Sequence, residues 1–209
     1  MSTSHIIAVI LGCVGILLSE GGCATSNYTH GVPNLVEVRP NIYRSGQPAT
    51  TDAWDYLERL GIRHILKLDF DDEGLETEAE LRGIEVVRVP IEPTTKAGFI
   101  DLVEDVFAEP SAESMSAILN TLQRIKDERG STGGWLIHCK NGHDRTGLVV
   151  GMLRVVVDGW DKHHAWVEML DRGYHPELIG LDRAFHDFTA RATSNNIPNP
   201  TTLQKDSAP

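Results

Sequence analysis

The stretch from His138 to Gly147, HCKNGHDRTG, holds residues whose types and spacing suit phosphate chemistry. Two of the three cysteines, Cys13 and Cys23, lie in an apolar leader, so Cys139 is the only thiol in the rest of the chain. Its polar neighbours argue against a cysteine that merely fills a core. Arg145 follows six residues later, and its planar guanidinium matches two oxygens of a phosphate group. The stretch therefore predicts a thiolate nucleophile beside an anion clamp.

The elements around this stretch must place the sulfur at a helix start. Residues 133–139, GGWLIHC, predict a buried strand that ends at the cysteine, and helical spacing begins at Asp144. A helix start offers unpaired N–H groups and a positive dipole end, which bind an oxyanion and favour a thiolate. Gly142 permits the tight curve of the loop, and Thr146 is placed to donate to the sulfur when it leaves.

The rest of the pattern alternates strands with helices. Strands are expected at 62–70, 84–91 and 133–139, and helices at 50–61, 74–83, from 144 onward, at 162–172 and at 181–192. This order predicts an α/β fold with a mostly parallel central sheet flanked by helices, in a single domain over residues 34–192. Ligands bind such sheets at the carboxyl ends of the strands, and Cys139 lies at one. Residues 193–209 are expected to form a flexible tail.

HCKNGHDRTG resembles the signature of the cysteine-dependent protein tyrosine and dual-specificity phosphatases: His-Cys, five residues, Arg, then Thr or Ser. Residues 41–48, NIYRSGQP, resemble the amino-terminal strand of small bacterial and fungal members, and residues 173–185 resemble their closing segment. The resemblance implies phosphomonoester hydrolysis through a cysteinyl-phosphate on Cys139, with no metal ion or cofactor. It also implies phosphate binding by the loop residues Lys140, Asn141, Gly142, His143, Asp144, Arg145 and Thr146.

The family also uses a general acid, usually an Asp on a loop before the cysteine, and the chain has no Trp-Pro-Asp motif there. The acidic candidates in that region are Glu92, Asp101, Glu104, Asp105 and Glu109. Their position ahead of the Pro110-Ser111 helix start favours Asp105 first, then Glu109. Asp144 is a rival, because some lipid-phosphate phosphatases carry an Asp-Arg pair in the loop. The alternatives are a solvated surface acid and, for Asp144, a carboxylate that stabilises the helix start.

The substrate class stays open. Lys140 and His143 beside Arg145 resemble the basic loop of phosphoinositide phosphatases, although general attraction of anions explains them as well. Phosphorylated proteins, phosphoinositides and small phosphate esters are all candidates. Other classes are a catalytically silent phosphate-binding module and a rhodanese-like sulfur transferase. A net charge of −11 disfavours nucleic acid as a partner. His163 and His164 lack metal-like spacing.

The first 23 residues are interpreted as a leader outside the fold. Residues 6–18 form a 13-residue apolar run, short for a bilayer span but typical of the core of a secretion signal. The Gly-Gly-Cys that follows resembles a bacterial lipoprotein signal, which would leave Cys23 as the lipid-modified first residue. We then expect an exposed linker over 24–33 and a periplasmic or outer-membrane lipoprotein. The alternatives are a soluble exported protein and an uncleaved anchor or miscalled start.

Overall fold

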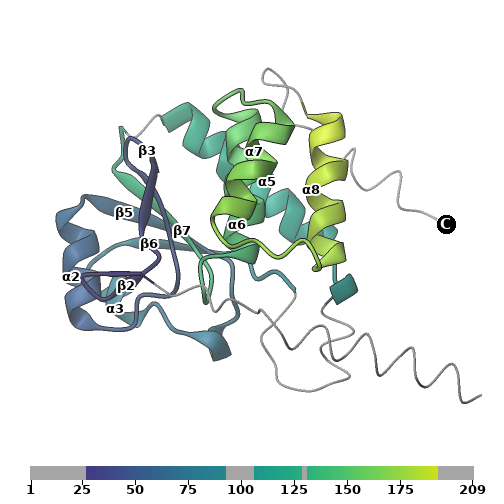
Figure 1. The fold of residues 1–209 in the computed structure, drawn as a ribbon. Coiled ribbons are helices and arrows are strands. Elements are labelled where there is room, and N and C mark those ends of the chain that lie inside the picture. Colours follow the sequence, from purple (N-terminus) through teal and green to yellow (C-terminus); the bar gives the residue numbers. More distant parts are fainter. Residues whose placement is uncertain (1–26, 93–105, 129–130, 193–209) are drawn as a thin grey trace, which may run out of the picture.

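A five-stranded sheet forms the centre of the computed structural model, which describes residues 27–92, 106–128 and 131–192 (Figure 1). In spatial order the strands are β3 (Val36–Arg39), β4 (Ile42–Ser45), β7 (Gly134–His138), β5 (Ile62–Lys67) and β6 (Glu85–Arg88). β3 runs antiparallel to β4, and all other neighbours are parallel. The predicted α/β fold with a mostly parallel sheet is confirmed.

Helices cover both faces of the sheet (Figure 1). On one face lie α2 (Thr51–Arg59) and α3 (Thr77–Leu81). On the other lie α5 (Ala112–Glu128), α6 (Asp144–Val156), α7 (Lys162–Asp171) and α8 (Ile179–Arg191). A short 3₁₀ helix, η1 (Asp71–Glu73), follows β5.

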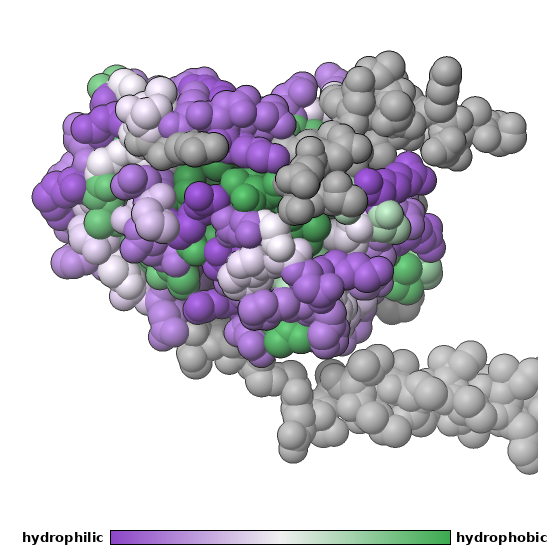
Figure 2. Space-filling model, turned by 90° about the horizontal axis from the view of Figure 1, so that it is seen from above, coloured by the Kyte–Doolittle hydropathy of each residue, from purple (hydrophilic) through white to green (hydrophobic). Residues whose placement is uncertain are grey.

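Strand β7 shows why both faces are buried. Trp135 and Ile137 pack into the larger core with α5, α6, α7 and α8, whereas Leu136 packs into the smaller core with α2. Successive side chains of a strand point to opposite faces, so an unbroken apolar run fits a strand covered on both sides. All five residues of β7 are buried. The outer surface is largely hydrophilic in the view of Figure 2, with a smaller hydrophobic area near its middle.

The stretch expected to be an exposed linker departs from that prediction where the structure describes it. Tyr28–Thr29 (β1) and Val32–Pro33 (β2) pair as a small antiparallel ribbon. Val32 is fully buried beside Trp54 and Leu57 of α2, and Gly46 N–H donates to the Pro33 carbonyl at 2.8 Å. The apolar Val32 side chain therefore attaches these residues to the domain.

The expected leader with Cys23, and the tail from 193, lie outside the described residues. Within the ranges that are described, no helix is both long and apolar enough to span a membrane.

The strand register gathers three loops at one edge of the sheet. His138 at the end of β7 pairs with Ser45 of β4 on one side and with Lys67 of β5 on the other. Because these strands are parallel, the segments that follow them begin side by side. This edge therefore holds the Cys139 loop, the 46–50 loop and the 68–76 segment.

Candidate active site

The cysteine loop, residues 139–145, joins β7 to the start of α6. The Gly142 N–H points at the Cys139 sulfur, with a nitrogen-to-sulfur distance of 3.3 Å. Cys139 is a free cysteine, only 2% exposed, and α6 begins at Asp144. The sulfur thus lies at a helix start and within reach of a backbone donor, as the sequence predicts.

Gly142 is required by two features of this loop. Its φ of +77° lies in the left-handed region, and an added Cβ would lie 2.5 Å from both the Gly46 nitrogen and the Ser45 carbonyl carbon. Both are backbone atoms and cannot move aside as a flexible side chain does. The cysteine loop therefore packs directly on the loop after β4.

We expect Gly142→Ala to destabilise the fold more than the same change at Gly83. Gly83 has a φ of +70° but open space around its Cβ position, so Gly83→Ala carries only the backbone penalty of about 1–2 kcal/mol. Gly142→Ala adds the clash with β4 and should cost about 1–3 kcal/mol more. Urea unfolding of the two variants measures the difference, and equal losses would contradict the close packing.

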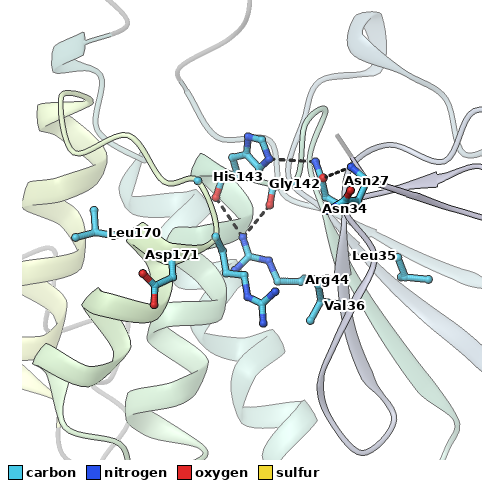
Figure 3. Close-up of a pocket in the computed structure, with 11 residues that line it drawn as sticks. Asn27, Asn34, Leu35, Val36, Arg44, Gly142, His143, Leu170 and Asp171 are labelled. Atoms are coloured by element: carbon cyan, nitrogen blue, oxygen red, sulfur yellow. Dashed lines mark hydrogen bonds between the residues drawn. The ribbon is translucent and has the colours of Figure 1, made fainter. Parts of the chain in front are cut away.

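Arg44 of β4 holds the outer side of the cysteine loop. It is 3% exposed, and its Nη2 donates to the Gly142 carbonyl at 2.8 Å and to the His143 carbonyl at 3.5 Å (Figure 3). Because Arg44 holds these two carbonyls on the side of the loop away from Cys139, the N–H of Gly142 faces the sulfur. Burial lowers the pKa of Arg44 to about 10, although its coulombic interaction with Cys139 opposes this shift. No role for Arg44 was predicted from the sequence, where the available signal was an arginine inside a strand.

Asn34 holds the same loop from the side. Its Nδ2 donates to the Asn141 carbonyl at 2.9 Å. The same nitrogen lies 3.0 Å from His143 Nε2, a contact that Figure 3 shows. Because Nδ2 is a donor, Nε2 accepts, which fits a neutral imidazole. Burial is the main cause that lowers the pKa of His143. His143 therefore contributes shape and loop anchoring more than positive charge at neutral pH.

Glu73 of η1 forms the most direct contact with the anion clamp. Arg145 is 4% exposed, and its Nη1 and Nη2 donate to the two Glu73 carboxylate oxygens at 2.6 and 2.9 Å. Burial alone would lower the pKa of Arg145, but the bonded carboxylate raises it above its usual value. Glu73 accepts one hydrogen bond from each terminal nitrogen of the guanidinium. The Nε–H and the second N–H of Nη2 are therefore left to donate to phosphate oxygens. Glu73 is thus a positioning residue for Arg145.

A buried polar cluster anchors the segment that carries Glu73. Lys67, 1% exposed, donates to the Gly74 carbonyl at 2.5 Å and pairs with Glu76 at 3.0 Å. Asp69 lies 3.8 Å from Nδ1 of His138. Burial raises the pKa of Asp69 and lowers that of His138 to about 4, so the imidazole behind Cys139 stays neutral at physiological pH.

Four residues that support the site were not predicted from the sequence: Glu73, Lys67, Asp69 and Glu76. A lysine and an aspartate in the otherwise apolar run ILKLDF, residues 65–70, were the signal that could have found the cluster.

The remaining loop residues lie where the sequence places them. Lys140 and Asn141 are exposed, and the Lys140 carbonyl accepts the Gln47 N–H at 3.0 Å. Thr146 is buried, and its hydroxyl has no hydrogen-bond partner among the described residues. Its donation to the leaving sulfur stays a prediction. The described ranges contain no group of three or more potential metal ligands, and His163 and His164 are exposed.

The structure describes only some of the general-acid candidates. Asp144 Oδ1 accepts the His175 N–H at 2.9 Å and lies 2.9 Å from its Nδ1, so it ties the start of α6 to the segment before α8. Glu109 pairs with Arg183 of α8 at 2.6 Å, and Glu92 is exposed. Asp105, Asp101 and Glu104 lie outside the described residues. The identity of the acid therefore stays a prediction.

Comparisons with known proteins agree with this geometry. The family model described as "Tyrosine phosphatase family" matches residues 32–171. The dual specificity protein phosphatase TpbA of Pseudomonas aeruginosa is 37% identical over 144 residues, which are 69% of this chain and 56% of that protein. The inositol diphosphatase DSP5 of Arabidopsis thaliana is 31% identical over 127 residues, 59% of this chain and 54% of that protein. The matches thus span about half the length of these relatives.

The comparison with solved structures agrees on the fold. The crystal structure of P. aeruginosa TpbA superposes with a TM-score of 0.57 at 24% identity, covering 78% of this chain and 88% of that one. At this identity the likeness shows the fold alone. With the family model matched over most of the domain and the cysteine loop in place, the chain belongs to the tyrosine phosphatase family, among the cysteine-dependent protein tyrosine and dual-specificity phosphatases.

Proposed function

We propose that this protein hydrolyses phosphomonoesters through a cysteinyl-phosphate intermediate on Cys139. The observation that carries the proposal is the joint placement of a sulfur under the Gly142 N–H and a buried Arg145 oriented by Glu73. The sulfur attacks phosphorus, the sulfur–phosphorus bond forms, and the bond to the ester oxygen breaks. The leaving oxygen takes a proton from the general acid. Water then cleaves the sulfur–phosphorus bond and releases inorganic phosphate.

Arg145 and the loop amides are the groups that stabilise charge in this reaction. In the transition state the equatorial phosphate oxygens carry the charge, and donors fixed in advance stabilise it without reorganising. Glu73 and Arg44 support this role, because one orients the guanidinium and the other turns the loop carbonyls away.

The general acid can be assigned by comparing leaving groups. We expect one of Asp105→Asn, Asp144→Asn or Glu109→Gln, in that order of preference, to slow an alkyl phosphate by about a hundredfold. The same variant should barely change para-nitrophenyl phosphate, whose phenolate leaves without a proton. Phosphate release from both esters is the measurement, with the exposed Asp187→Asn as control. Parent-like rates in all three variants would place the acid elsewhere.

For the substrate we propose phosphorylated protein, with phosphotyrosine or dual-specificity preference. The match to a dual specificity protein phosphatase supports this choice. The match to inositol diphosphatases and the exposed Lys140 of the cysteine loop keep phosphoinositides and small phosphate esters as the alternative. A panel of phosphopeptides, inositol phospholipids and inositol diphosphates, compared by phosphate release, decides between them. No release from any member would favour a silent phosphate-binding module.

We also propose that the mature protein begins at Cys23 and is held at a membrane by lipid on that residue. The 13-residue apolar run and the Gly-Gly-Cys support the proposal. Each buried CH₂ of an acyl chain contributes about 0.8 kcal/mol, so more than one chain holds the domain firmly. Labelling of cells with a clickable fatty acid should mark the parent and the Cys13→Ser control but not Cys23→Ser. An unlabelled, soluble parent would rule out the anchor without affecting the phosphatase proposal.

A further inference from the structure

A cavity of about 350 Å³ lies on the outer side of the cysteine loop (Figure 3). Its walls include Asn34, Val36, Arg44, His143, Arg172 and Gly173. Cys139, Arg145 and Glu73 do not line it. The Gly142 N–H faces the sulfur whereas its carbonyl faces Arg44, so the cavity and the phosphate cradle lie on opposite sides of the loop.

Arg44 is a buried cation in the wall of this cavity, and only one of its three guanidinium nitrogens donates hydrogen bonds to the described residues. Among the described residues its hydrogen bonds all come from Nη2, and its guanidinium forms no ion pair with a carboxylate within 4 Å. Asp171 lines the same cavity without reaching that distance. Nε and Nη1 therefore keep donors that the protein does not use. A guanidinium buried to this degree normally has its charge matched by an anion.

Arg172, which lines the cavity and is exposed, adds a second positive charge. Burial is the main cause that lowers the pKa of Arg44, and the positive charge of Arg172 adds to the shift, while Cys139 and Glu168 offset part of it. Two like charges close enough to disfavour one another are stabilised together by an anion between them. The apolar wall of Leu35, Val36 and Leu170 leaves room for a small organic group beside that anion.

We propose that this cavity is a second anion site, which binds inorganic phosphate or the phosphate group of a small ester through Arg44 and Arg172. The anion accepts from Arg44 Nε and Nη1 and from the Arg172 guanidinium, with no covalent step. Because the cradle at Cys139 faces the other way, both sites bind a phosphate group at the same time. The inference does not depend on the proposed hydrolysis.

The test is a titration of the ¹⁵N-labelled full chain with inorganic phosphate, followed by NMR. Amide signals of Val36 and Gly173 report on the cavity, and those of Asn141 and Gly142 report on the cysteine loop. We expect both sets to shift saturably. Arg172→Ala should weaken binding at the cavity set about tenfold relative to the loop set, the loss expected for one charge-assisted contact. Arg59→Ala, an exposed arginine on α2, should leave both curves unchanged.

A second titration with phenylphosphonate, which is not hydrolysed, distinguishes the two ligand sources. Tighter cavity binding of the phosphonate than of phosphate indicates a phosphorylated small molecule, and the reverse order indicates the free ion. Non-saturating shifts at Val36 and Gly173, or an Arg172→Ala curve equal to that of Arg59→Ala, would overturn the proposal. Arg172 is exposed, so its variant tests the site without risk to the fold.

Discussion

Replacing Cys139 by serine is expected to abolish phosphate release while leaving the fold intact. The hydroxyl stays protonated at neutral pH and is a weak nucleophile, so the rate should fall by about four orders of magnitude or more. The side chains are of similar size, and the Gly142 N–H that faces the sulfur can face an oxygen equally well. Initial rates on para-nitrophenyl phosphate and urea unfolding of the same sample measure both parts of the prediction.

Cys13→Ser is the matched control, because it makes the same chemical change outside the described domain. Its activity should equal that of the parent. If Cys139→Ser kept more than a few per cent of the parent activity, the sulfur would not be the nucleophile.

Arg145→Lys should lower kcat by about a thousandfold, although the positive charge is kept. The compact tetrahedral ammonium of lysine cannot pair in one plane with both Glu73 oxygens and with two phosphate oxygens, whereas the guanidinium has five N–H donors in a fixed plane. Glu73→Gln should lower kcat less, by about tenfold, because the arginine stays but loses its orienting partner.

A double-mutant cycle tests whether Glu73 affects kcat through Arg145 or independently of it. If Glu73 acts through Arg145, the double variant Glu73→Gln/Arg145→Lys should be no slower than Arg145→Lys alone. Additive losses would mean that Glu73 acts on the reaction by another route.

The local part of the site could be predicted from the sequence because its signals are contiguous. A five-residue buried strand, a cysteine, a glycine with positive φ and a helix start follow one another between Gly134 and Asp144. Each has its own sequence signature, and the local geometry follows from the backbone alone.

The supporting residues could not be placed in this way. Arg145 and Glu73 are 72 residues apart, and Arg44 and Gly142 are 98 apart. Such contacts follow from the strand order β4-β7-β5, which periodicity does not specify. The sequence did indicate that such contacts exist. Arg44, Lys67 and Asp69 are charged residues within or next to buried strands, where a charged side chain rarely lies without a partner.

The ribbon at Tyr28–Pro33 is a structured part of the domain that was predicted to be an exposed linker. Its mostly polar composition, with one Gly and one Pro, is typical of a linker, yet one buried valine and one backbone hydrogen bond from Gly46 attach it to the domain. Asn34, directly after it, then reaches the cysteine loop. A short segment with one apolar anchor is difficult to distinguish from a linker by composition alone.

Trapping the phosphorylated enzyme tests the central claim most directly. The chain is mixed with ³²P-labelled phosphopeptide and quenched in acid during turnover, and its proteolytic peptides are analysed by mass spectrometry. The account predicts a labelled phosphoryl group on the peptide that contains Cys139, and no label in Cys139→Ser treated in the same way. Turnover with no label on Cys139, or with the phosphoryl group on another residue, would contradict it.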